Sequence, residues 1–275
     1  MNEQEKWIVP EEQGGQRLDK ALEAVLSGSG LRLRRRLCDD GRVLVDGRAM
    51  KPGYKVSAGQ CVILLGGEKA VLPEDLGLMV VERHGGFLAV YKPGEVHSAV
   101  IAGRDVPSVE ALLPSMLPGE APVLLNRLDF LTSGLLLVAL TEDAVRVWRD
   151  AEESGNIRKF YVAEVEGRFD GVTTVRNKLD TADRKITRIL DETDGDPRRW
   201  TDVQVLSHDW GRNTSMVTCL IVKGARHQIR AHLASIGHPI IGDSIYGAGR
   251  EGDALHLHHR RVELPGFTAE VSAPF

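Results

Sequence analysis

A continuous apolar run, Leu135 to Leu140, constrains the fold of this chain more than any other feature of its sequence. The run is short and is followed by a polar segment, so it predicts a strand that is buried on both faces. Thr132, Ser133 and Gly134 directly precede it. Hydroxyl side chains and a glycine are typical of a tight turn, so we expect a turn that leads into this core strand.

A single carboxylate, Asp129, lies just before this turn, and Arg127 lies close to it on the N-terminal side. A core strand would hold Asp129 rigidly near its N-terminal end, which is a suitable place for a catalytic carboxylate. The alternative is that Arg127 and Asp129 form an ordinary surface ion pair beside a turn. The pattern of residues by itself leaves both interpretations open.

The composition indicates the class of protein and its compartment. A chain of 275 residues with 42% hydrophobic and 27% charged residues is expected to form one large domain, or a medium and a small one. Cys38, Cys61 and Cys219 are far apart, which predicts free thiols in a reducing compartment. The first residues are charged, and no apolar run approaches the roughly 20 residues that span a bilayer. We therefore expect a cytoplasmic protein with no membrane partner.

The first part of the chain predicts a small module. After a polar lead-in to residue 15, apolar residues recur at helical spacing from Arg17 to Leu26, and a second helix is expected at 31–37. Val43–Val45 followed by Asp46-Gly47 predicts a strand and a tight hairpin. Basic residues exceed acidic ones here, although the net charge of the chain is −4. The excess predicts a phosphate-binding surface, with a solvated helix face as the alternative; its members include Arg32, Arg34, Arg35, Arg36, Arg42 and Lys51.

The remainder of the chain predicts a larger domain that mixes helices and strands. Thr141 is expected to cap a helix, because acidic residues follow it in the first turn. The polar residues 191–199 predict a loop. Periodicity also predicts strands at 159–166, 203–206 and 215–222 and a helix at 226–236.

Three motifs resemble those of the RluA-type pseudouridine synthases. The stretch 126–136 matches the central motif of that family, except that Asn126 stands where histidine is usual. Lys159-Phe160-Tyr161-Val162-Ala163 matches a second motif, and 224–243 matches a third. Near the N-terminus, segments at 16–20, 41–47 and 51–54 resemble the S4-type RNA-binding domain.

The resemblance implies a fold of class α+β with two domains. Residues 1–66 would form a small α/β S4-type domain, and 67–77 would be a linker. Residues 78–275 would form the catalytic domain of a pseudouridine synthase, an isomerase, which is built on a large, mainly antiparallel mixed sheet.

The resemblance also implies roles for individual residues. Asp129 would be the catalytic carboxylate, and Arg230 would orient it and keep it ionised. Tyr161 would pack against the target base or serve in removal of the C5 proton, and Arg127 would help to hold an everted uridine. The carboxylate would either add covalently or remove a sugar proton, and the sequence leaves both routes open.

The same resemblance implies that RNA is the partner. The extra S4-type module favours large-subunit ribosomal RNA over tRNA as the substrate, and a monomer is expected. The reaction needs no redox change or energy input, so no cofactor is expected, and the histidine spacing predicts no metal site. The competing hypothesis is a non-catalytic RNA-binding or ribosome-assembly protein with the same fold.

Overall fold

The computed structural model describes residues 5–26, 30–65, 72–104, 106–183 and 185–275. The chain divides into two units, Met1–Val71 and Leu72–Phe275. The division falls inside the segment 67–77 that the sequence predicts as a linker. Residues 67–71 lie outside the described residues, and Pro73–Leu76 form the 3-10 helix η3 of the second unit.

The first unit contains a four-stranded antiparallel sheet with the strand order β1-β4-β2-β3. The predicted hairpin is present, because Asp46 and Gly47 both have the positive φ that a two-residue turn requires. The predicted lead-in instead contains a strand, in which Trp7 pairs with Val62 and the following Val9 is buried. The elements of this unit are β1 (Glu5–Ile8), η1 (Glu11–Gln13), α1 (Leu18–Ala21), η2 (Leu22–Ala24), α2 (Leu31–Asp39), β2 (Val43–Val45), β3 (Arg48–Ala49) and β4 (Cys61–Leu64).

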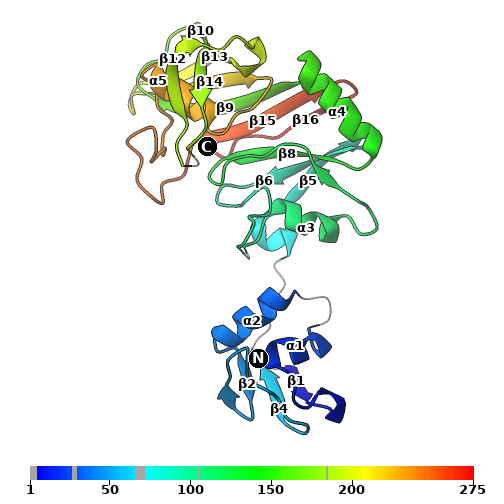
Figure 1. Cartoon of the computed structure of the whole chain (residues 1–275). Helices are drawn as coiled ribbons and strands as arrows, with labels where there is room; N and C mark the ends of the chain where they lie inside the picture. Colours follow the sequence, from blue (N-terminus) through cyan, green and yellow to red (C-terminus); the bar gives the residue numbers. More distant parts are fainter. Residues whose placement is uncertain (1–4, 27–29, 66–71, 105, 184) are drawn as a thin grey trace. The chain divides into compact units, whose positions relative to one another are not determined.

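The second unit is built on a ten-stranded sheet whose main path has the order β10-β13-β14-β9-β15-β8-β6-β5 (Figure 1). All its neighbours are antiparallel except β15 and β8, so the predicted large, mainly antiparallel mixed sheet is confirmed. The strands are β5 (Met79–His84), β6 (Phe87–Lys92), β7 (Val123–Leu124), β8 (Ser133–Ala139), β9 (Arg158–Glu166), β10 (Val172–Val175), β13 (Thr201–Asp209), β14 (Thr214–Ile221), β15 (Leu257–Leu264) and β16 (Phe267–Glu270).

Strand β8 is the predicted core strand, and every residue in it is buried. Successive side chains of a strand point to opposite faces of the sheet. Leu136 and Val138 join the core cluster that contains residues of α3 (Val109–Met116) and α5 (Gln228–Ser235). Leu135, Leu137 and Ala139 join the cluster that contains Trp148 of α4 (Glu142–Ser154). The sheet is therefore covered on both faces at the point where the central motif enters it.

The predicted helix cap at Thr141 and the predicted loop at 191–199 can both be compared with the structure. The hydroxyl of Thr141 accepts from the amide of Ala144 (3.2 Å), which confirms the predicted cap of α4. The region around 191–199 is more ordered than predicted: β11 (Asn177–Asp180) pairs with β12 (Arg188–Thr193), and η4 (Pro197–Arg199) follows. No helix within the described ranges has the length and apolar character needed to cross a membrane.

Because two histidines of β15 are buried, we expect the second unit to be less stable at acid pH. His258 and His259 are fully buried, and burial lowers their pKa values to about 4 and about 3. The unfolded chain takes up protons on these groups below about pH 6.5, whereas the folded chain does not. The free energy of unfolding should therefore fall as the pH decreases from about 6.5 to about 4, by up to about 1.4 kcal/mol per pH unit for each histidine.

Denaturant unfolding at a series of pH values measures this slope. His258→Gln should reduce it, whereas His84→Gln, which changes an exposed histidine of β5, should leave it as in the wild type. Equal slopes for the wild type and His258→Gln would contradict the prediction.

Candidate active site

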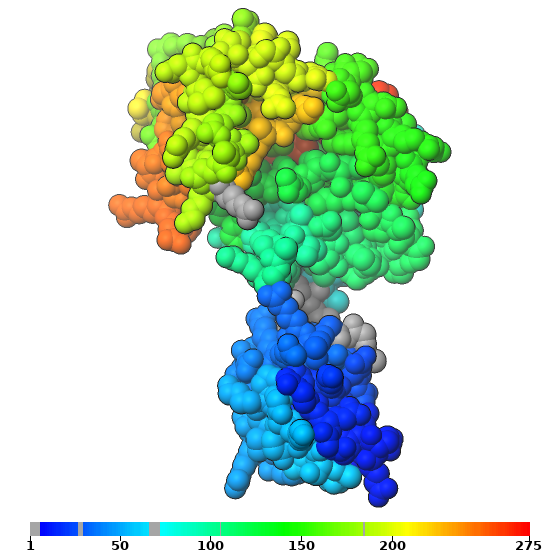
Figure 2. Space-filling view, viewed as in Figure 1, coloured from blue at the N-terminus to red at the C-terminus, as the bar shows by residue number. Residues whose placement is uncertain are grey.

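A pocket of about 920 Å³ opens in the second unit. The space-filling view shows this unit hollowed between its green and yellow segments (Figure 2). Its walls come from the loop after β6, the connection between β7 and β8, part of β9, and the loop that enters α5. The last three of these segments carry the three motifs, which are far apart in the sequence.

The connection between β7 and β8 carries Asp129 and is fastened to its surroundings. The hydroxyl of Ser98 donates to the carbonyl oxygen of Leu128 (2.8 Å) and accepts from the amide of the same residue (3.0 Å). The side-chain oxygen of Asn126 accepts from the amide of Leu137 in β8 (2.7 Å). Asn126, which departs from the family motif, thus ties the loop to the core strand. Asp129 is thus held near the N-terminal end of β8, as the sequence predicted.

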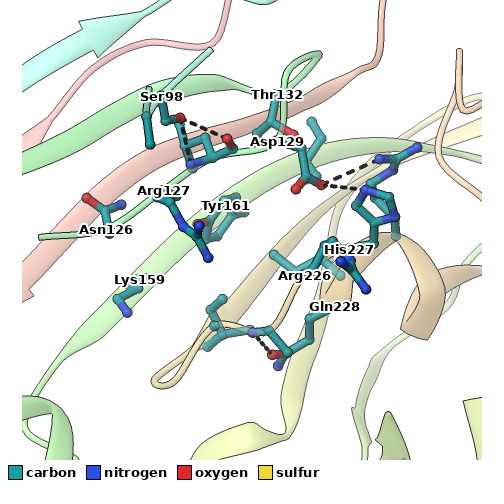
Figure 3. Close-up of a pocket in the computed structure, with 18 of the residues that line it drawn as sticks. Ser98, Asn126, Arg127, Asp129, Thr132, Lys159, Tyr161, Arg226, His227 and Gln228 are labelled. Carbon is teal, nitrogen blue, oxygen red and sulfur yellow. Dashed lines mark hydrogen bonds and ion pairs between the residues drawn. The ribbon is translucent and has the colours of Figure 1, made fainter. Parts of the chain in front are cut away.

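The carboxylate of Asp129 contacts two side chains from the region of α5. Arg230 Nη1 lies 3.4 Å from Asp129 Oδ2, and His227 Nε2 lies 3.8 Å from the same oxygen. Figure 3 shows Asp129 and His227 pointing towards each other across the pocket. Among the described contacts of Asp129, none is with Arg127, so the surface ion pair that the sequence left open is absent from this part of the chain.

Arg230 is itself fixed by a second buried carboxylate, Asp243. The pair is bidentate, with Arg230 Nε 2.8 Å from Oδ2 and Nη2 2.9 Å from Oδ1. Asp243 Oδ1 also accepts from the amides of Ile245 and Tyr246. Burial alone would raise the pKa of Asp243, but the hydrogen bonds and charge of Arg230 outweigh burial and the pKa is lowered. An ionised Asp243 therefore holds the guanidinium that faces Asp129.

Lys92, at the end of β6, lies beneath the same loop and is fully buried. Its Nζ donates to the carbonyl oxygens of Pro93 (2.8 Å), Val96 (2.9 Å) and Phe130 (3.2 Å). Burial lowers the pKa of Lys92 to about 7, against the opposing effect of Asp129. Three carbonyl acceptors are satisfied together only by the ammonium form, which has three N–H donors. Lys92 thus ties the residue after Asp129 to the neighbouring loop.

Tyr161 and Lys159 enter the pocket from β9. The ring of Tyr161 is stacked on that of His259, with centroids 4.5 Å apart, and burial raises the pKa of the phenol. Lys159 Nζ lies 3.0 Å from Glu152 and 4.9 Å from the centre of the Trp148 ring. Tyr161 therefore has a fixed orientation and stays protonated at neutral pH.

Two arginines lie at the pocket wall in different states. Arg127 is exposed and lines the pocket (Figure 3). Arg226 is partly buried, and its Nη2 donates to the carbonyl oxygen of Thr181 (2.6 Å). The hydroxyl of Thr187 donates in turn to the carbonyl oxygen of Arg226 (2.8 Å). These bonds fasten the turn between β11 and β12 to the loop that enters α5.

The predicted RNA-binding residues of the first unit differ in exposure. Arg34 is buried and pairs with Glu23 (3.1 Å), so its guanidinium is not accessible to a phosphate. Arg35 donates to buried Asp19 (2.8 Å), and the pKa of Asp19 is lowered to about 2 by hydrogen bonds first from Arg17 and then from Arg35. The side chains that remain accessible are Arg32, Arg35, Arg36 and Lys51, with Arg42 partly buried.

Three residues of this site, Lys92, His227 and Asp243, received no role from the sequence. His227 and Asp243 lie inside the third motif, and Lys92 precedes Pro93 in a further apolar segment. The sequence signal that could have identified these three residues is that each is a polar residue within an apolar segment or a motif. Their roles depend on partners that the sequence does not bring together, such as the carbonyl oxygen of Phe130 for Lys92.

Comparisons with known proteins identify the family of the chain. Residues 86–235 match the family described as RNA pseudouridylate synthase, and residues 16–61 match the S4 domain. An uncharacterized RNA pseudouridine synthase of Chloroflexus aurantiacus is 30% identical over 94% of this chain and 82% of its own length. The ribosomal large subunit pseudouridine synthase D of Escherichia coli K12 is 30% identical over 87% of this chain and 75% of its own length.

A solved structure is similar as well. The structure titled Human RNA Pseudouridylate Synthase Domain Containing 1 superposes with a TM-score of 0.59 and 27% sequence identity, covering 73% of this chain and 84% of its own. The match of the family model covers the central motif, the second motif and the whole of α5. The chain therefore belongs to the RNA pseudouridylate synthase family and carries an S4 domain ahead of the synthase fold.

Proposed function

We propose that this RNA pseudouridine synthase acts on large-subunit ribosomal RNA, with Asp129 as its catalytic carboxylate. The observation that carries the assignment of Asp129 is its position in the 920 Å³ pocket, where Arg230 contacts its Oδ2. The reaction breaks the bond between N1 of uracil and C1′ of the ribose, turns the base and joins C5 to C1′. Attack on C1′ and removal of the 2′ proton both require an ionised carboxylate, and the guanidinium of Arg230 fixes the direction of this one.

The other side chains of the pocket suit supporting roles in this reaction. Arg230 orients Asp129, and Tyr161 packs against the everted base. Because burial raises the pKa of Tyr161, its phenol suits packing better than proton removal. Arg127 is exposed at the pocket and is suited to occupy the place that the target uridine leaves in the RNA stack.

The first unit is proposed to hold the RNA without reading its sequence. The S4 match and the accessible arginines of α2 support phosphate contacts by Arg32, Arg35, Arg36, Arg42 and Lys51. The proposed domains are residues 1–66 for this role and 78–275 for catalysis, joined by 67–77. Relatives named ribosomal large subunit pseudouridine synthase D support ribosomal RNA as the substrate. We further propose a monomer in the cytoplasm, in keeping with the free thiols of Cys38, Cys61 and Cys219.

Pseudouridine mapping of total RNA tests the function. Cells with the gene intact, deleted and restored should differ at one or more uridines of large-subunit ribosomal RNA, with the modification lost on deletion and regained on restoration. If deletion instead removes a pseudouridine from a tRNA, the substrate is tRNA and not large-subunit ribosomal RNA. If no site changes in cells that also lack related synthases, a non-catalytic role in ribosome assembly would replace the proposed function.

A further inference from the structure

His227, at the start of α5, has a backbone conformation that non-glycine residues seldom adopt. Its φ of 53° and ψ of 17° lie in the left-handed region. Such conformations persist only where the surrounding structure maintains them, and they gather at functional sites. The side chain of His227 is only 12% exposed, and its ring stands edge-on to that of Tyr246, with centroids 5.7 Å apart. The imidazole thus lies between Tyr246 and Asp129.

The contacts of His227 favour the tautomer that carries its proton on Nε2, because that nitrogen faces a carboxylate, which only accepts. The amide of Thr187 donates to the hydroxyl oxygen of Tyr246 (2.7 Å), because a backbone N–H cannot accept. The hydroxyl proton of Tyr246 is then available to His227 Nδ1, which lies 3.1 Å away. With Nδ1 as the acceptor, the neutral imidazole carries its proton on Nε2, which faces Asp129. The opposite tautomer would turn a nitrogen lone pair towards the carboxylate.

Burial favours the neutral form of His227, whereas the charged groups around it act in both directions. They are Asp129, Asp243, Arg226 and Arg230. Burial lowers the pKa of His227 most, the two arginines lower it further, and the two aspartates oppose them. The hydroxyl of Tyr246, by donating to Nδ1, also favours the neutral ring.

The two side chains that face Asp129 both lie nearest to the same oxygen atom, Arg230 at hydrogen-bond distance (3.4 Å) and His227 slightly farther away (3.8 Å). Arg230 Nη1 and His227 Nε2 lie near Oδ2, while Oδ1 has no polar partner among the described residues. We propose that His227 is a positioning residue that, with Arg230, holds Oδ2 of Asp129 and leaves Oδ1 as the oxygen that acts on the sugar. This inference rests on the proposed function, in which Asp129 is the catalytic carboxylate.

Both donors are held by Asp243. This carboxylate binds the guanidinium of Arg230 and accepts from the amide of Tyr246 (3.0 Å). Tyr246 holds His227 through Nδ1, and its ring lies 5.4 Å from the guanidinium carbon of Arg230. The positions of the two donors are therefore coupled through one buried residue, which explains how a contact as long as 3.8 Å has a defined direction.

Steady-state kinetics of the full chain test the proposal, with an RNA transcript that contains the uridine identified by mapping. His227→Asn keeps a residue that tolerates positive φ but removes the imidazole. It should lower kcat by about 10- to 100-fold, because a misdirected carboxylate costs rate, and should change KM by less than about 3-fold. Tyr246→Phe keeps the ring beside Arg230 and removes the hydroxyl, so it should lower kcat by about 3- to 10-fold.

The pH profile separates positioning from a merely structural role. In the wild type, protonation of His227 should reduce kcat at acid pH, since an imidazolium draws charge from the carboxylate. Burial lowers the pKa of His227, so this fall should lie below the usual range of a histidine. Tyr246→Phe should move this midpoint upward, because the bond that favours the neutral ring is lost. In His227→Asn, this decrease of kcat at acid pH should be absent. A midpoint that is the same in the wild type and both variants, or a wild-type kcat in His227→Asn, would overturn the proposal.

Two further variants make the outcomes distinguishable. His84→Asn, a matched change at an exposed histidine, should keep the wild-type kcat and pH profile. Asp129→Asn tests the proposed function alone. If Asp129→Asn is inactive while His227→Asn behaves as the wild type, only the positioning role fails. If Asp129→Asn equals the wild type, or if the wild type is inactive, the proposed function fails and the positioning role with it.

Discussion

Asp129→Asn should bind its RNA as the wild type does and form pseudouridine at least about 10³-fold more slowly, a loss of about 4 kcal/mol in transition-state stabilisation. The asparagine amide has nearly the same shape as the carboxylate but carries no negative charge. It can neither attack C1′ nor remove the 2′ proton, so both routes are blocked. Phosphate contacts remote from the pocket remain, and these should dominate affinity.

The fold should not suffer from this change. Asp129 is about 25% exposed, and its contact with Arg230 is long, at 3.4 Å. Arg230 keeps its bidentate partner, Asp243, so no buried charge is left without a counterion. Single-turnover assays and RNA-binding titrations would measure the two effects separately. Asp150→Asn, at an exposed position of α4, serves as the control and should match the wild type. Turnover within about 10-fold of the wild type would exclude Asp129 as the catalytic carboxylate.

Gly134→Ala should destabilise the second unit by at least about 3 kcal/mol. Gly134 has a φ of 119°, and β8 passes so close to β15 there that an added Cβ would lie 2.5 Å from the backbone nitrogen of His259. Its carbonyl oxygen would be nearer still. Both atoms belong to the backbone of the paired strand, so neither can turn aside. The parallel pairing of His258 with Ser133 and of His259 with Gly134 would have to separate.

Gly171→Ala provides a matched control for this prediction. Gly171 also has a positive φ, of 81°, but nothing lies within 4 Å of the position of an added Cβ. It should therefore show only the cost of the backbone conformation, about 1 kcal/mol. Denaturant unfolding of both variants separates steric conflict from backbone strain. A Gly134→Ala protein no less stable than Gly171→Ala would refute the close approach of β8 and β15.

The parts of the fold that the sequence predicted are those determined by local signals. The burial of β8 follows from its continuous apolar run, the start of α4 from Thr141, and the first hairpin from Asp46-Gly47. Each of these features depends on residues that are close together in the sequence. Asp129 was proposed as the catalytic residue through the resemblance of its motif to a known family, because the local pattern also allowed a surface ion pair with Arg127.

The parts that were missed depend on distant partners or on one face of a helix. Strand β1 exists because Trp7 pairs with Val62, and no local pattern marks it. Arg34 counted as one more basic residue in the sequence, although helical spacing places it on the buried side of α2 with Leu37 and Cys38. The role proposed for His227 depends on Asp129 and Tyr246, which both lie outside its own helix.

The position of β15 has a consequence for the order in which the pocket can be assembled. β15 lies between β9, which carries Tyr161, and β8, which follows Asp129 (Figure 1). Its pairing joins His258 to Ser133, 125 residues earlier. Both halves of the sheet are synthesised before β15, yet no strand pairing among the described residues connects them without it. The two halves of the pocket are therefore brought together only when β15, which is synthesised after both, pairs with β9 and β8.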